Sequence, residues 1–303
     1  MRHRHIRTYG GYIMVQIERT VREYHQNHQT LRQNRVRTRS GDTLEYLTFP
    51  LLEETGIVKH LFTTRTGGVS TGEFATMNFS VDRGDSRENV LENYGRIAEA
   101  LDVRTEDMAI SHQTHTTNIR RMTAGDKGKG ILRPRDYTDV DGMVTDEPGL
   151  VLVTFYADCV PLYFVDPVHR AIGLAHSGWR GTAGRMGECM VKAMGEHFGS
   201  RAEDLYAAIG PSICRDCYEV SEDVAVRFIR MLGEKVAVPG KAPGKYQLDL
   251  WLANKLILEQ AGISPSRMAV TDICTCHNSG YLFSHRASGG RRGNVAAFLA
   301  LKD

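Results

Sequence analysis

Residues 155–184, FYADCVPLYFVDPVHRAIGLAHSGWRGTAG, hold a Cys, a His and an Arg beside small residues: Cys159, His176 and Arg180. A thiolate and an imidazole are ligands of zinc, and a catalytic zinc takes three protein ligands and keeps one position open. The same two side chains can also form the nucleophile and base of a cysteine hydrolase. The stretch therefore predicts chemistry if Cys159 and His176 meet.

The two apolar runs within residues 161–176, separated by an Asp-Pro dipeptide, predict a β-hairpin. A turn centred between Val168 and His169 pairs Pro161 with His176. Cys159 then lies on the same face, diagonal to His176, where one metal ion could bridge the two. A slip of one residue in the turn would move one of them to the other face.

A third ligand must come from another segment, and ISHQTHTTNI offers His112 and His115. Because these are three residues apart, a strand would point them to opposite faces, and only one could reach the metal. The spacing does not choose between them. Nor does it separate a metal site from an ordinary buried cysteine beside a structural histidine.

The motif GWRGTAG begins two residues after His176 and leads into a helical pattern. Free backbone N–H groups near Thr182, together with Arg180, predict a pocket for an anion. Gly178 and Gly181 would allow backbone or ligand to approach closely. The alternative is a Trp–Arg stacking pair at the surface.

The other cysteines offer a second, weaker metal pattern. Cys214 and Cys217 in CRDC, with Cys274, Cys276 and His277 in CTCH, could form a structural zinc site. Only one residue separates the two thiols of CTC, and GPSIC is also typical of a turn after a strand. We therefore expect no structural zinc here, and reduced thiols throughout, since no signal peptide is visible.

The elements that must position these residues alternate along the chain. GLVLVTFYAD predicts a buried strand. Apolar spacing predicts amphipathic helices, the second with a stripe of Met186, Met190 and Met194. The helical segments are RENVLENYGRIAEAL, TAGRMGECMVKAMGEHF, SEDVAVRFIRMLG and DLWLANKLILEQAG. This alternation indicates an α/β or α+β fold in one domain.

Composition sets outer limits on the function. The chain has 303 residues, 41% hydrophobic, with a net charge of +2, which does not suggest a nucleic-acid coat. No run reaches transmembrane length and no secretory signal is visible. We expect a cytoplasmic protein that binds neither nucleic acid nor membrane and needs no obligatory protein partner.

Residues 1–40 form a basic arm with nine Arg against two Glu, a charge of about +7. Its composition favours a flexible, solvated extension that precedes a catalytic domain over residues 41–303. A contact with nucleic acid or membrane is an alternative, but aromatic residues are not interleaved with the basic ones. An upstream start codon is another, in which Met14 begins a shorter product.

Seven groups of motifs, in order, resemble the YfiH/YlmD family, from about residue 60 to the end. They are TTRTGGVS with MNFS, HQTH, DVDGMVT, ADCVPLYFVDP, GLAHSGWRGT, IGPSICRDCYEV and CTCHNSGYLFSHRASGGRRGNVAAF. The family was formerly called laccase-domain or multicopper polyphenol oxidoreductases and is now described as purine nucleoside phosphorylases with adenosine deaminase activity. This chain departs from the family pattern at two places. Family members often have Gly at the position of Cys214, and they have HAGWRG where this chain has HSGWRG.

The resemblance implies an α/β single-domain mixed-sheet sandwich, related to the catalytic domain of the cytotoxic necrotizing factor toxins. It implies zinc ligands at His115, Cys159 and His176, and places Arg65 of the TRTGG motif at the active site. Residues 1–40 have no counterpart in the family core.

The hypothesis that follows is a zinc-dependent phosphorylase of adenosine, inosine and methylthioadenosine that also deaminates adenosine. Zinc would bind phosphate for attack at C1′ of the ribose, or water for attack at C6 of adenosine. Arg65 and Arg180, with Thr182, would hold the phosphate. Asp158 or Asp141 would protonate the departing base.

Three alternatives remain at this point. A copper-dependent phenol oxidase is one, although His3 and His5 in the arm could bind copper adventitiously and mimic it. A cysteine hydrolase with Cys159 as nucleophile and His176 as base is another. The third is a metal-stabilised binding module without catalysis.

Overall fold

The computed structural model describes residues 8–9, 12–13, 16–25 and 31–303. The first strands, β1 (Thr8–Tyr9) and β2 (Tyr12–Ile13), pair with each other. Within the described residues, every helix is too short or too polar to cross a membrane.

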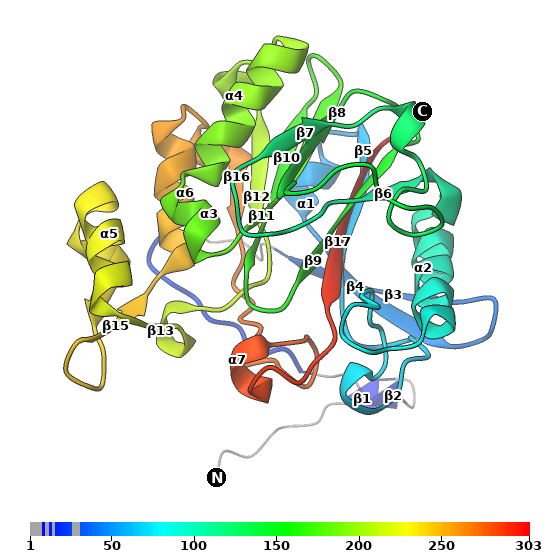
Figure 1. The fold of residues 1–303 in the computed structure, drawn as a ribbon, viewed down its shortest axis with the longest axis horizontal. Helices are drawn as coiled ribbons and strands as arrows, with labels where there is room; N and C mark the ends of the chain where they lie inside the picture. The colour runs from blue at the N-terminus through cyan, green and yellow to red at the C-terminus, as the bar shows by residue number, and fades with distance from the viewer. Residues whose placement is uncertain (1–7, 10–11, 14–15, 26–30) are drawn as a thin grey trace.

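Two six-stranded sheets form the centre of the molecule (Figure 1). One has the order β16 (Met268–Val270), β12 (Tyr206–Ile209), β10 (Val160–Asp166), β11 (Ala171–Ser177), β8 (Gly142–Thr145), β7 (Ile119–Arg121). The other has the order β3 (Arg32–Arg37), β4 (Thr43–Thr48), β5 (Val58–Thr63), β17 (Val295–Leu301), β9 (Val151–Tyr156), β6 (Met108–Ile110).

The alternation of side chains along the strands explains why the sheets stack. On β10, Tyr163 and Val165 face a core shared with Phe62 and Leu299 of the other sheet. The intervening residues of β10 face the helices on the outside. Because the strands are apolar on both faces, each sheet needs a cover on both sides.

Helices cover the outer faces. On one side lies α2 (Arg87–Leu101), and on the other lie α3 (Trp179–Ala183), α4 (Met186–Phe198) and α6 (Leu250–Gln260) (Figure 1). The remaining helices are α1 (Pro50–Glu53), α5 (Glu222–Leu232) beside a small sheet of β13 (Glu219–Ser221), β15 (Lys245–Leu248) and β14 (Ala237–Pro239), and α7 (His285–Ser288). The expected mixed-sheet α/β sandwich in one domain is confirmed.

The expected helix patterns are also confirmed. The α2 helix begins after Ser86, whose hydroxyl accepts a hydrogen bond from the backbone N–H of Asn89 at 3.1 Å. The α4 helix buries the whole stripe of Met186, Met190 and Met194. These stripes pack against the sheets as the 3.6-residue period requires.

One expectation about α4 is wrong. GWRGTAG does not form the first turn of the methionine-striped helix, because a separate helix, α3, ends at Ala183. Arg185 adopts a left-handed conformation with φ of 60°, which interrupts the helical backbone between α3 and α4. The free N–H groups at the start of α4 therefore do not lie at Thr182.

The basic arm is partly built into the fold. Strand β3 pairs with β4 along its whole length, so a boundary at residue 40 divides a β-hairpin. Residues 16–25 lie against the segment after β16, where Thr20 N–H donates to the carbonyl of Asp272 at 2.7 Å, and against the start of α6, where Tyr24 donates to the carboxylate of Asp249. For residues 1–7, 10–11, 14–15 and 26–30, the prediction of a flexible extension lies outside the described residues.

A buried histidine joins α1 to β5. His60 is 5% exposed, and its Nε2 accepts a hydrogen bond from the backbone N–H of Phe49 at 2.8 Å. Burial lowers the pKa of His60 to about 3, with the charge of Lys302 as a second cause. The imidazole is therefore neutral in the folded chain.

This histidine predicts a loss of stability in weak acid. Below the unfolded-state pKa of about 6.5, the unfolded chain binds a proton that folded His60 rejects, so the free energy of unfolding falls by about 2 kcal/mol between pH 7 and pH 5. His60→Gln keeps an acceptor but does not titrate, so this part of the fall should vanish. Urea unfolding of both proteins at the two pH values measures the difference; identical pH dependence would contradict the prediction.

Candidate metal centre

Cys159 lies where the chain passes from one sheet to the other. Three residues, Ala157, Asp158 and Cys159, connect β9 to β10. Asp158 takes a left-handed conformation with φ of 88°. Its carboxylate accepts hydrogen bonds from Thr275 Oγ1 at 2.6 Å and from the backbone N–H of Arg286 at 2.7 Å, which holds this strained crossover in place.

His115 lies in the loop between β6 and β7, also in a left-handed conformation, with φ of 67°. The carboxylate of Asp141, just before β8, accepts hydrogen bonds from the backbone N–H groups of Thr114, His115 and Thr116 at 2.9–3.1 Å. This cradle of three amides stabilises the turn and presents the imidazole of His115.

The same carboxylate also orients His176. His176 is near the end of β11, and its Nδ1 lies 2.8 Å from Asp141 Oδ1. A proton on Nδ1 donates to the carboxylate, which leaves Nε2 to face Cys159. A carboxylate behind a histidine in this way is the usual support of a metal-binding imidazole.

The structure brings the three predicted ligands together. Pro161 pairs with His176, as the hairpin prediction requires. The ligand atoms of His115, Cys159 and His176 all lie within 4.8 Å of one another, and Cys159 Sγ is 4.0 Å from His115 Nε2. Around one tetrahedral zinc, a sulfur and a nitrogen donor, or two nitrogen donors, lie about 3.3–3.6 Å apart, so the three residues fit a metal after a small contraction.

Of the two histidines of HQTH, His115 lies in this group of donors. His112 forms no part of this group of donors, and its Nδ1 accepts a hydrogen bond from the backbone N–H of Asp139 at 3.1 Å. His115 is exposed, Cys159 is half-buried and His176 is buried, so the group opens toward solvent on one side.

The charges of the three residues depend on one another. Burial raises the pKa of Cys159, but His176 and His115 outweigh it and bring the pKa to about 6. Burial lowers the pKa of His176, but Cys159 and Asp141 outweigh it and bring the pKa to about 9. Burial likewise opposes the charge of Asp141, yet its bonds to His176 hold its pKa near 2. The thiol is therefore poised as a thiolate, the form that binds metal.

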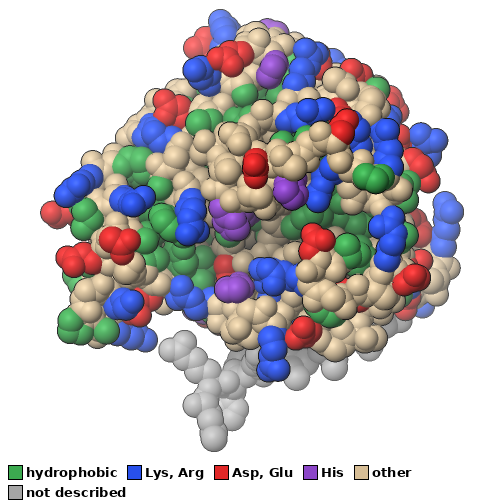
Figure 2. Space-filling model, in the orientation of Figure 1, with side chains coloured by type: hydrophobic (Ala, Val, Ile, Leu, Met, Phe, Trp, Pro, Cys, Tyr) green, Lys and Arg blue, Asp and Glu red, His purple; other side chains and the backbone are tan. Residues whose placement is uncertain are grey.

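The candidate centre lies at the wall of a pocket of about 510 Å³. This volume is typical of sites for small ligands. Figure 2 shows the hollow in the middle of one face, with histidines and basic residues around it. Its cationic lining comprises Arg83, Arg135, Arg291 and Arg292.

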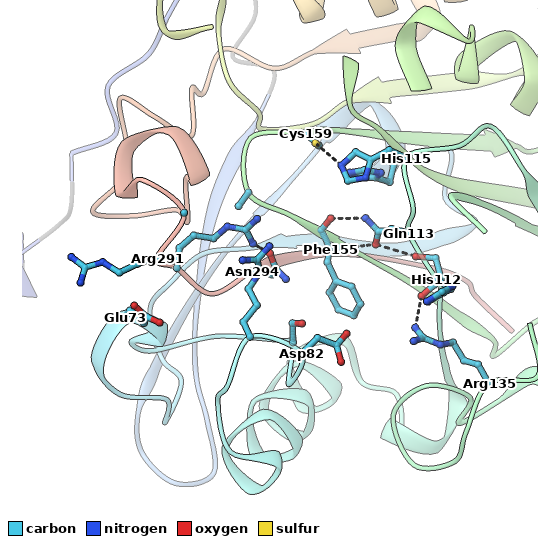
Figure 3. Close-up of a pocket in the computed structure, with 17 residues that line it drawn as sticks. Glu73, Asp82, His112, Gln113, His115, Arg135, Phe155, Cys159, Arg291 and Asn294 are labelled. Carbon is cyan, nitrogen blue, oxygen red and sulfur yellow. Dashed lines mark hydrogen bonds between the residues drawn. The ribbon is translucent and has the colours of Figure 1, made fainter. Parts of the chain in front are cut away.

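Figure 3 shows how the pocket is arranged, with Cys159 and His115 at one end and Asp82 and Glu73 at the other. Gln113 joins this wall to β9, because it donates to the carbonyl of Phe155 at 2.8 Å and accepts from its N–H at 2.7 Å. The two bonds place the loop that carries His115 against the sheet.

The predicted phosphate-binding residues do not line this pocket. Arg65 donates to the carbonyls of Ala75 and Ser279, both at 2.9 Å. Arg180 is exposed and stacks on the ring of Trp179 at 4.5 Å, which is the alternative weighed from the sequence.

Thr182 and Asp158 have structural contacts as well. Thr182 is fully buried, where its hydroxyl lies 2.9 Å from that of Ser177 and accepts from the side-chain amide of Asn254 at 3.1 Å. Both carboxylate oxygens of Asp158 accept hydrogen bonds, as described above. The anion pocket expected at Arg180 and Thr182 is therefore not formed by these two side chains.

Arg292 is the residue that the sequence-based reasoning missed. Its guanidinium donates to the carbonyl of Gly293 at 3.2 Å and to Asn294 Oδ1, while Nε is buried and has no hydrogen-bond partner among the described residues. Burial lowers its pKa to about 10, with Arg83 as a second cause. The sequence feature that could have pointed to Arg292 is the pair of arginines in SGGRRGN, which follows two glycines.

Comparisons with known proteins show the family of the chain. A family model described as multi-copper polyphenol oxidoreductase laccase matches residues 59–302. The chain belongs to this family. The purine nucleoside phosphorylase YlmD of Bacillus subtilis is 36% identical over 248 residues, covering 80% of this chain and 88% of the relative. A purine nucleoside phosphorylase of Deinococcus radiodurans is 38% identical over 254 residues, covering 83% and 93%.

Solved structures give the same result. The crystal structure of YlmD from Geobacillus stearothermophilus matches with a TM-score of 0.79 and 36% identity, covering 85% of this chain and 96% of that chain. The crystal structure of the hypothetical protein YfiH of Bacillus licheniformis matches with a TM-score of 0.80 and 34% identity, with the same coverage. The expected membership of the YfiH/YlmD family is confirmed.

Gly178 provides a steric test of the metal centre. A Cβ at this position would lie 2.9 Å from Cys159 Sγ and 3.1 Å from His115 Cδ2, so Gly178→Ala should push both side chains out of position. We expect zinc affinity, measured by competition with a chromogenic chelator, to fall roughly ten-fold or more. Gly181→Ala is the matched control, because its Cβ would meet no atom closer than 3.5 Å. Equal affinities of the two variants would contradict the prediction.

Proposed function

We propose that this protein is a zinc-dependent purine nucleoside phosphorylase that also deaminates adenosine. The observation that carries the proposal is the convergence of His115, Cys159 and His176 at the wall of a cationic pocket. Relatives that match four fifths of the chain are named purine nucleoside phosphorylase, which supports the substrate class of nucleoside and phosphate.

The donor set suits a catalytic zinc. One thiolate and two imidazoles are ligands of a catalytic zinc site, which has three protein ligands. Zinc in such a site supplies a Lewis acid for an oxygen nucleophile. His115, Cys159 and His176 would hold the ion, and Asp141 would keep His176 in the tautomer that binds it.

The cationic lining suits phosphate. Arg292 is the best-placed anchor, because its buried Nε lacks a partner and its guanidinium faces the same pocket as Cys159. Arg83 lies close enough to lower the pKa of Arg292, so the two cations would share one anion. Arg291, in contrast, is exposed and points away from Cys159 (Figure 3).

In phosphorolysis, a phosphate oxygen forms a bond to C1′ of the ribose while the C1′–N9 bond breaks. The purine leaves with the electron pair and takes up a proton. Asp141 is unsuited to donate this proton, because its pKa is held near 2 and its oxygens accept bonds from the His115 turn and His176. We assign Asp141 to positioning the metal ligands.

The second candidate is a cysteine hydrolase. The pKa values of Cys159 and His176 are displaced in the directions of a thiolate–imidazolium dyad, which favours it. The His115 imidazole beside the same thiol is not required by a dyad, whereas a metal centre uses it. Chelation separates the two, since a dyad keeps its activity without metal. For the copper oxidase alternative, His3 and His5 lie outside the described residues.

The proposal predicts that metal and phosphorolysis are lost together. Cys159→Ala removes one of three ligands, so both the zinc at this centre and phosphate-dependent release of hypoxanthine from inosine should fall at least about 100-fold. Cys189→Ala is the control, since Cys189 lies on α4, outside the group of His115, Cys159 and His176, and donates to the carbonyl of Gly184. A Cys159→Ala protein that lost metal but kept phosphorolysis would rule the mechanism out.

The assignment of Arg292 has its own test. Arg292→Ala should raise the KM for phosphate by about 10- to 100-fold, the usual contribution of a charged hydrogen-bond pair, with Arg292→Lys intermediate. Adenosine deamination, which uses no phosphate, should change much less. Arg180→Ala should alter neither value by more than about two-fold, because Arg180 stacks on Trp179 at the surface. If Arg180→Ala raised the KM for phosphate more than Arg292→Ala did, phosphate binding would be assigned to Arg180, as the sequence analysis expects.

A further inference from the structure

A second group of metal-binding side chains lies outside the proposed active site. The ligand atoms of Cys214, Cys217, Cys274 and His277 all lie within 4.8 Å of one another. We propose that these four residues form a closed structural zinc site. The proposal is independent of the enzymatic function, because it uses none of the residues assigned to that function.

The sheet explains why these residues meet. Strands β12 and β16 are parallel neighbours, so both end at the same edge of the sheet. Beyond the strands, Ser212 and Cys274 form a further parallel bridge, in which the N–H of Thr275 donates to the carbonyl of Ser212 at 3.1 Å. The loop with Cys214 and the loop with Cys274 therefore run side by side.

Each loop contributes two ligands with two residues between them. Cys214 and Cys217 flank a short 3-10 turn, in which the N–H of Cys217 donates to the carbonyl of Cys214 at 3.1 Å. Cys274 and His277 have the same spacing. Cys276 is not in the group. The short spacing between Cys274 and Cys276, which argued against zinc in the sequence, therefore does not apply to these four residues.

The chemistry of the group fits zinc. Three thiolates and one imidazole are a common set for structural zinc, which is bound by four protein ligands. Cys214 and Cys274 are fully buried, and Cys214 Sγ lies 4.0 Å from His277 Nδ1. The N–H of Cys214 donates to Cys274 Sγ at 3.3 Å, a bond of the kind that stabilises a metal-bound thiolate.

The site would join three parts of the chain. Thr20 Oγ1 lies 3.2 Å from His277 Nδ1 and the carboxylate of Glu18 lies 3.9 Å from it, so the segment 16–25 packs directly on the group. On the inner side, the N–H of Ile213 donates to the carbonyl of Asp158 at 3.0 Å. Thr275 donates to the carboxylate of Asp158, as described above. The ion would thus stabilise the loops that hold the crossover before Cys159.

Zinc counting on the intact chain tests the proposal. The protein is purified in reducing buffer, exchanged against zinc-free buffer, and analysed by elemental analysis and by native mass spectrometry. We expect about two zinc ions per wild-type chain and one in Cys217→Ala. His277→Cys should keep both, because four thiolates also hold zinc. Cys276→Ala is the matched control and should keep both.

Cys159→Ala decides the question without altering the group. One tightly held zinc should remain in this variant, and its removal by a strong chelator should lower the Tm by roughly 5 °C or more. A Cys159→Ala chain with no zinc would overturn the proposal, as would a mass 2 Da too low, which indicates a disulfide among these cysteines. A single zinc in the wild type that Cys217→Ala removes and Cys159→Ala does not would instead refute the metal centre of the proposed function.

Discussion

The buried carboxylate of Asp141 is the interaction on which the candidate active site depends. It accepts hydrogen bonds from the turn that carries His115 and from the ring of His176, and so fixes two of the proposed ligands, which come from separate segments. Four N–H groups aimed at one buried anion satisfy its charge without a Lys or Arg partner. A neutral side chain of the same shape would leave several of these donors unpaired, at a cost of about 1–3 kcal/mol for each.

The stacking of the two sheets determines where this carboxylate can act. The chain leaves one sheet at Tyr156 and enters the other at Val160, so the crossover brings Cys159 to the edge of the shared core. There β8 starts beside β11, which places Asp141 next to His176. Local strain at Asp158 and His115, both left-handed, is the cost of this arrangement, and hydrogen bonds to their neighbours offset it.

Local patterns in the sequence predicted much of this arrangement. The Asp-Pro turn determined the hairpin register, and hence the pairing of Pro161 with His176, because strand residues alternate strictly. The directions of the Arg180 and Arg292 side chains were beyond such reasoning, since a long side chain can turn toward a pocket or stack on a neighbour. The convergence of CRDC with CTCH depends on β12 lying beside β16, a pairing that the spacing of the cysteines does not encode.

Strand β3 closes one edge of its sheet with basic side chains. It forms one edge of its sheet, where Arg32, Arg35 and Arg37 line the outermost strand and Arg35 pairs with Glu45. A chain shortened to residue 41 would leave β4 at the edge, with unpaired amides beside the apolar Leu44 and Leu47. Such an edge is a template for strands of other molecules, whereas a rim of arginines repels them. Strand β3 thus covers the backbone amides of β4 that would otherwise be open to pairing.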